Sequence, residues 1–253
     1  MRGVAVLIPD KRGSGQSGGD WMTAGFDVLA EDAAASLEAL RSLESVDESR
    51  CGVVGLSQGG WVAPDAARLC DGAYAASLVT AFTTPGEQIL HDVLMSFRAD
   101  GVPESTIAEA RDVLLLLGEY IRTGEGWAAY DEAATALRAA APAIADAFPP
   151  SPDLPMIRFF SLIFDFDFEA AVQAYDGPKC LLLGAVDHLD NVPIDVTLAN
   201  AGAFLAAHPR ADLQIQVYPH MGHALGEERV KWVSPKMLDD LSSWIDWRTE
   251  AQQ

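Results

Sequence analysis

Short apolar runs alternate with longer helical patterns along this chain, and this alternation restricts its possible folds more than any other feature. The runs are rich in β-branched residues or leucine, as expected of strands buried on both faces of a parallel sheet. They comprise residues 4–9, 51–56, 76–82, 181–184 and 213–218. Strands and helices that alternate in this way predict an α/β fold with a mostly parallel, doubly wound sheet.

Helical periodicity fills the intervals between these runs. Apolar residues recur at three- and four-residue steps from Phe26 to Leu43, and a second helix is expected over residues 61–70. A third amphipathic pattern follows Pro235. These helices would cover the faces of the predicted sheet.

Residues 85–176 interrupt the alternation. Their pattern is mostly helical, and a proline-rich break at residues 148–155 precedes an aromatic cluster at residues 159–168. We therefore predict a helical cap, residues 85–176, inserted into an α/β core made of residues 1–84 and 177–253. Some of the cap's apolar side chains could line an acyl-binding pocket, although most are expected to pack the cap itself.

Composition and charge exclude several classes of function. Lysine and arginine number 17 against 37 acidic residues, and the resulting net charge of −20 repels phosphate backbones, so we expect no nucleic-acid partner. No apolar run approaches the roughly 18 residues that span a bilayer, and the first residues do not resemble a signal peptide. The three cysteines are widely spaced and predict buried free thiols, with a disulfide between two of them as the alternative. Together these features predict a cytoplasmic protein.

A G-x-S-x-G pattern occupies residues 55–59, between a predicted strand and a predicted helix. In this context a serine stands on a sharp turn with its hydroxyl exposed at the carboxyl end of the sheet. The backbone N–H of the next residue then points to the place where an oxyanion would form. Ser57 is therefore the candidate nucleophile, and Gln58 the candidate oxyanion donor.

A serine nucleophile needs a base, and the base needs an orienting acid. We favour His223 over His220 as the base, because Gly222 would give its loop the freedom to turn the imidazole toward the serine. Asp187 follows the predicted strand at residues 181–184 and is the favoured acid, with Asp190 as the alternative.

Four motifs in this order resemble the serine α/β-hydrolase superfamily, in its bacterial esterase branch near dienelactone hydrolases and prolyl oligopeptidases. They are D-x-R-G-x-G-x-S-x-G at residues 10–19, G-L-S-Q-G-G-W at 55–61, G-A-V-D at 184–187 and G-H at 222–223. The resemblance covers nearly the whole chain and implies a catalytic triad of Ser57, Asp187 and His223.

The resemblance also raises an expectation about the beginning of the sequence. Members of that superfamily carry strands before the counterpart of residues 4–9, and a loop there supplies a second oxyanion N–H. We expect those strands to be missing here, which would leave Gln58 as the single donor. Loss of one such donor typically costs on the order of 10²–10³ in rate.

Residues 13–18 also fit the dinucleotide-binding pattern G-x-G-x-x-G. Residues 10–12 separate these glycines from the predicted strand, and residues 19–21 delay the helix that would receive a pyrophosphate. We therefore expect no nicotinamide cofactor. The candidate catalytic residues imply no metal either.

The sequence predicts a serine hydrolase that cleaves a carboxylic ester or related acyl bond of a small molecule through an acyl-enzyme. A peptidase of the same fold that acts on short peptides is one alternative. A truncated, non-catalytic hydrolase-like scaffold is the other.

Overall fold

A parallel sheet forms the centre of the computed structural model, which describes residues 3–226 and 233–250. Within these residues the sheet has four strands in the order β1-β2-β3-β4, and every neighbouring pair is parallel. The strands are β1 (Val53–Leu56), β2 (Ala75–Leu78), β3 (Lys179–Gly184) and β4 (Leu213–Tyr218). The predicted α/β fold with a parallel sheet is confirmed.

One predicted strand is wrong. Residues 4–9 belong to no strand, and the described part of the chain gives them no sheet partner. Val6 and Ile8 are 73% and 87% exposed. Composition alone made this segment look like a buried strand, whereas a strand also needs a neighbour to bond with its backbone.

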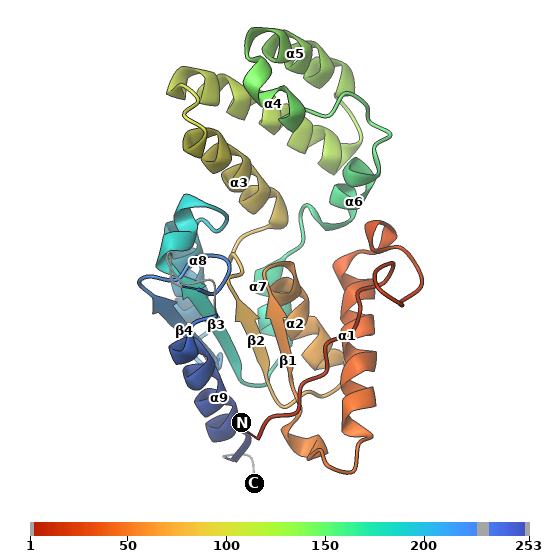
Figure 1. The fold of residues 1–253 in the computed structure, drawn as a ribbon, viewed down its shortest axis with the longest axis vertical. Coiled ribbons are helices and arrows are strands. Elements are labelled where there is room, and N and C mark those ends of the chain that lie inside the picture. The colour runs from red at the N-terminus through yellow and green to blue at the C-terminus, as the bar shows by residue number, and fades with distance from the viewer. Residues whose placement is uncertain (1–2, 227–232, 251–253) are drawn as a thin grey trace.

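Helices cover both faces of the sheet, as Figure 1 shows. The side chains of β3 alternate, so that Leu181 and Leu183 are buried on one face while Cys180 and Leu182 are buried on the other. The first face packs against α1, α2, α7 and α8, and the second packs against α9. These helices are α1 (Phe26–Arg41), α2 (Gln58–Leu69), α7 (Phe168–Ala174), α8 (Ile194–Ala207) and α9 (Pro235–Glu250).

The remaining helices form a layer beyond the carboxyl ends of the strands (Figure 1). They share an apolar cluster that includes Phe97, Tyr130 and Phe148, while Phe159 and Ile163 of the same layer belong to a cluster against the sheet. These helices are α3 (Pro85–Ala99), α4 (Glu104–Thr123), α5 (Trp127–Ala140) and α6 (Pro155–Ile163). This layer lies within residues 85–176, and the division of the chain into core and cap stays a prediction.

Short 3-10 segments complete the described elements. They are η1 (Trp21–Thr23), η2 (Glu48–Arg50), η3 (Pro142–Ala147) and η4 (Ala185–Leu189). Cys51, Cys70 and Cys180 are buried free thiols, as predicted. Among the helices that the structure describes, none combines the length and the apolar character needed to cross a membrane.

Candidate active site

Ser57 occupies a strained turn between β1 and α2. Its backbone angles are φ 52° and ψ −118°, a conformation that costs a residue with a side chain about 1–3 kcal/mol. Its N–H donates to the carbonyl of Leu78 (2.8 Å), and its own carbonyl accepts from the N–H of Gly60 (2.9 Å). The hydroxyl of Thr80 also lies 3.0 Å from that carbonyl. These contacts hold the serine in the conformation that the G-x-S-x-G pattern predicted.

Two glycines near Ser57 make this turn possible because a Cβ atom on either would overlap atoms packed against it. A Cβ atom on Gly55 would lie 1.9 Å from the carbonyl oxygen of Gly59, and one on Gly60 would lie 1.9 Å from Thr80 Oγ1. A Cβ on Gly59 would meet nothing within 4 Å. The steric requirement therefore falls on Gly55 and Gly60, and only the first of these belongs to the five-residue motif.

Asp187 and His223 reach Ser57 from two other strand ends. Asp187 lies in η4, directly after β3, and His223 lies in the loop after β4. His223 Nε2 is 3.0 Å from Ser57 Oγ, and His223 Nδ1 is 3.0 Å from Asp187 Oδ2. With Nδ1 donating to the carboxylate, Nε2 is free to accept the serine proton. The structure thus joins the three predicted residues in one hydrogen-bonded chain.

The carboxylate of Asp187 is fully buried. Its Oδ1 atom has no hydrogen-bond partner among the residues that the structure describes. The bond to His223 is therefore the side-chain contact that stabilises this charge, and a buried, under-satisfied carboxylate interacts strongly with an imidazole cation.

The alternative residues lie outside this hydrogen-bonded chain. Asp190 is exposed, and its N–H donates to the carbonyl of Asp187 at 3.0 Å. His220 is exposed in the turn after β4. Gly222, which favoured His223 in the sequence, has an ordinary negative φ and open space around its Cβ position. Several backbone hydrogen bonds hold this loop. Among them, the N–H of Val186 donates to the carbonyl of Met221 (3.2 Å), and the N–H of Leu225 donates to that of Gly222 (3.1 Å).

Nearby carboxylates raise the pKa of His223. Burial is the largest influence and favours the neutral imidazole, but the hydrogen bond and charge of Asp187 act in the opposite direction. The charges of Asp190 and Asp92 add to this effect, and the pKa rises above its ordinary value of 6.5. The site therefore stabilises an imidazolium cation next to the serine.

Helix α3 contributes side chains to this region that the sequence did not single out. His91 Nε2 is 3.0 Å from the carbonyl of His188, and the Gln88 amide contacts Asn191. Asp92 is close enough to His223 for their charges to interact. Residues 88, 91 and 92 share one helix face, yet a sequence pattern alone does not say that this face meets the loop after β3.

Gln58 begins α2, so its N–H belongs to the first turn, where no intrahelical acceptor exists. This N–H has no hydrogen-bond partner among the described residues. It is therefore free to donate to a negatively charged oxygen formed beside Ser57.

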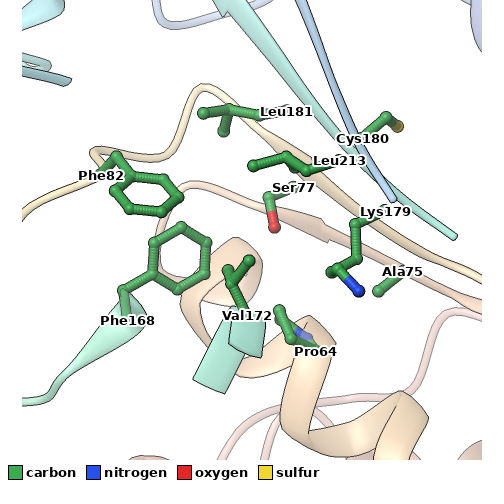
Figure 2. Close-up of a pocket in the computed structure, with 10 residues that line it drawn as sticks. All are labelled: Pro64, Ala75, Ser77, Phe82, Phe168, Val172, Lys179, Cys180, Leu181 and Leu213. Atoms are coloured by element: carbon green, nitrogen blue, oxygen red, sulfur yellow. The ribbon is translucent and has the colours of Figure 1, made fainter. Parts of the chain in front are cut away.

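Figure 2 shows a small cavity of about 10 Å³ between the sheet, α2 and α7. Its space suits about one water molecule, and none of Ser57, Asp187 and His223 lines it. We therefore assign no substrate to this cavity. Its walls are formed by Pro64, Ala75, Ser77, Phe82, Phe168, Val172, Lys179, Cys180, Leu181 and Leu213. Within the described residues, no group of three or more histidine, cysteine or acidic side chains is placed to hold a metal ion.

Comparison with known proteins identifies a family and several similar folds. Residues 1–235 match the model of the alpha/beta hydrolase family. DcsB, solved in complex with a substrate analogue, is 16% identical with a TM-score of 0.56, and the alignment covers 95% of this chain and 79% of that chain. No curated protein matches the sequence.

Two further solved structures share the fold at similar identity. The esterase PF2001 of Pyrococcus furiosus is 13% identical with a TM-score of 0.51, and the alignment covers 95% of this chain and 67% of that chain. A proline iminopeptidase of Mycobacterium smegmatis is 15% identical with a TM-score of 0.50, and the alignment covers 93% of this chain and 76% of that chain. At this level of sequence identity, the three similarities establish a shared fold and no shared activity.

Proposed function

Because the chain belongs to the alpha/beta hydrolase family, we propose that it is a serine hydrolase that cleaves a carboxylic ester or related acyl bond. The observation that carries this proposal is the hydrogen-bonded chain from Asp187 through His223 to Ser57, with 3.0 Å at each step. An esterase among the similar folds agrees with this choice of bond.

In the first half of the reaction, Ser57 Oγ attacks the carbonyl carbon of the substrate. His223 Nε2 takes the hydroxyl proton as the new C–O bond forms, and the carbonyl electrons move onto oxygen. Asp187 stabilises the resulting imidazolium and holds its Nδ1–H in place. The tetrahedral intermediate then collapses, the bond to the leaving alkoxide breaks, and His223 returns the proton to that alkoxide.

In the second half, water replaces the serine. His223 removes a proton from a water molecule, which attacks the acyl-enzyme carbonyl, and the second tetrahedral intermediate expels Ser57 Oγ with the proton from His223. In both halves the free N–H of Gln58 donates to the oxyanion, assisted by the positive end of α2. The proposed chemistry uses three side chains of this chain, the Gln58 backbone N–H and water.

The helical layer formed by α3 to α6 would act as the cap that shapes substrate choice. Helix α3 reaches the candidate site, because His91 and Gln88 contact the loop that carries Asp187. A peptidase that acts on short peptides is the second candidate, favoured by the proline iminopeptidase among the similar folds. The same three residues would serve both reactions.

A substrate panel tests the proposal. Purified protein is assayed with p-nitrophenyl esters of increasing acyl length and, in parallel, with aminoacyl p-nitroanilides, each beside the Ser57→Ala variant. We expect turnover of one or more esters that Ser57→Ala abolishes. Turnover of anilides alone would replace the esterase by the peptidase, and no Ser57-dependent turnover of either series would support a non-catalytic scaffold.

A further inference from the structure

The loop at residues 10–19 presents a cation to the candidate active site. This loop is ordered by its own hydrogen bonds: Asp10 Oδ2 accepts from the N–H of Gln16 (2.9 Å), and Lys11 O accepts from the N–H of Ser14 (2.8 Å). A Cβ on Gly15 would fall 2.1 Å from Asp10 Oδ2, so glycine lets the loop close around this carboxylate. The motif that resembled a dinucleotide-binding loop thus builds a compact turn.

The side chains of Lys11 and Arg12, which are adjacent in this turn, bind different partners. The guanidinium of Arg12 makes two bonds of 2.7 Å with the carboxylate of Asp32 on α1, which fixes the turn to that helix. The ammonium of Lys11 donates to the side-chain oxygen of Gln58 at 2.5 Å and lies 4.5 Å from the centre of the Trp21 ring. Lys11 therefore contacts the residue that directly follows the nucleophile.

Lys11 is half-buried, and no carboxylate pairs with it among the residues that the structure describes. None of the ion pairs in the described part of the chain includes Lys11, whereas Arg12 beside it is paired. Burial lowers the pKa of its ammonium, which means that its surroundings disfavour the charge. A partly desolvated cation held by a neutral amide and a ring contributes little to stability.

We propose that Lys11 is a positioning residue for the oxyanion donor, and this inference rests on the proposed hydrolase function. By holding the side chain of Gln58, Lys11 fixes the first turn of α2 and the peptide that carries the free N–H. Leu78, Thr80 and Gly60 hold the Ser57 side of the same turn. Lys11 holds the next residue of this turn, through the Gln58 side-chain oxygen.

The test is a double-mutant cycle between Lys11 and the Gln58 side chain. Lys11→Met and Gln58→Met remove the contact and keep the chain lengths, and neither removes the Gln58 backbone N–H. The readouts are the rate of covalent labelling by a fluorophosphonate, whose phosphoryl oxygen occupies the oxyanion position, and kcat and KM on an ester that the wild type hydrolyses. Lys236→Met, on the exposed face of α9, is the matched control.

We expect Lys11→Met to slow labelling and lower kcat by about 10- to 100-fold, the range expected when a reacting geometry is displaced. KM should change little, because the interaction acts in the transition state. The double variant should be no slower than the slower single variant, and the melting temperature of Lys11→Met should stay near that of Lys236→Met.

Labelling of Lys11→Met at the wild-type rate would overturn the inference, and so would effects of Lys11→Met and Gln58→Met that multiply in the double variant. Either result leaves the proposed function intact, because the wild type still labels. A wild type that neither labels nor hydrolyses any ester is a different outcome, in which the proposed function fails and the role of Lys11 fails with it.

Discussion

The Nε2 atom of His223 lies 3.0 Å from the Oγ atom of Ser57, although 166 positions separate the two residues in the sequence. The topology of the sheet accounts for this contact. Ser57 follows β1, Asp187 follows β3 and His223 follows β4, and parallel strands place all their carboxyl ends at one edge. Three loops that are distant in the sequence therefore meet above that edge.

Replacing Asp187 by asparagine should remove most of the activity. The buried carboxylate orients His223 and stabilises its cation, and an amide can do neither with the same tautomer, so kcat/KM should fall by about 10³- to 10⁴-fold. Asp190→Asn is the matched control, because this exposed carboxylate lies outside the hydrogen-bonded chain. A larger loss in Asp190→Asn than in Asp187→Asn would assign the role of the acid to Asp190.

The pH dependence of activity should reflect the raised pKa of His223. The imidazole must be neutral to accept the serine proton, so kcat/KM should rise with pH through a midpoint above 6.5. Asp190→Asn removes one negative charge that favours the cation and should move this midpoint to lower pH. A midpoint below 6.5, or a shift to higher pH in the variant, would contradict this assignment.

The same pKa also predicts how His223 affects folding. A raised pKa in the folded state means that the folded protein holds this proton more tightly than the unfolded chain does. The contribution of His223 to the free energy of unfolding is therefore complete below the unfolded value of about 6.5. It should be lost as the pH rises through the folded value, and His223→Gln should flatten this part of a chemical-denaturation profile measured against pH.

Alanine substitutions should divide the glycines of the serine turn into two groups. A Cβ at Gly55 or Gly60 would overlap existing atoms at 1.9 Å, so Gly55→Ala and Gly60→Ala should lower the melting temperature and slow fluorophosphonate labelling. Gly59 is in α2 with open space at its Cβ position, and alanine favours a helix by about 1 kcal/mol over glycine. Gly59→Ala should therefore be neutral or stabilising, and a melting temperature as low as that of Gly55→Ala would contradict this steric explanation.

Thr80→Val should loosen the turn that carries Ser57. The buried Thr80 hydroxyl lies 3.0 Å from the Ser57 carbonyl and 3.1 Å from that of Leu78, and loss of a buried hydrogen bond costs about 1–3 kcal/mol. We expect a lower free energy of unfolding in urea and slower labelling by the fluorophosphonate. Thr135→Val, on the exposed surface of α5, is the control and should leave the labelling rate unchanged.

Local sequence was enough to predict two strands, one buried along its whole length and one whose exposed and partly buried residues alternate. The predicted strand at residues 213–218 coincides with β4, and the predicted strand at 181–184 lies within β3. Residues 4–9 have the same apolar character and form no strand, because pairing depends on a neighbouring strand that no local pattern contains. The strand predicted at residues 76–82 ends at Leu78, where Val79 adopts a positive φ of 46° and turns the chain out of the sheet.

The nucleophile and the base of the candidate site could be predicted, because the proposed chemistry requires a serine and a histidine at these places in the fold. A serine on a strand-to-helix turn and a histidine after the last strand follow from the order of the motifs. The positions of Lys11 and Asp92 beside this site could not be predicted, because they depend on how the loop at residues 10–19 and helix α3 pack against it. The freedom of Gly222 favours His223 in the sequence, whereas the structure holds the same loop by several backbone hydrogen bonds, that of Val186 to Met221 among them.

The most direct test of the central claim is whether Ser57 becomes covalently modified by a fluorophosphonate. Intact-mass analysis of the wild type should show one added phosphonyl group, peptide mapping should locate it on Ser57, and Ser57→Ala should remain unmodified. His223→Gln should fold as the wild type does and label far more slowly. A folded wild-type protein that gains no mass, or one that carries the adduct in Ser57→Ala, would contradict the assignment of Ser57 as the nucleophile.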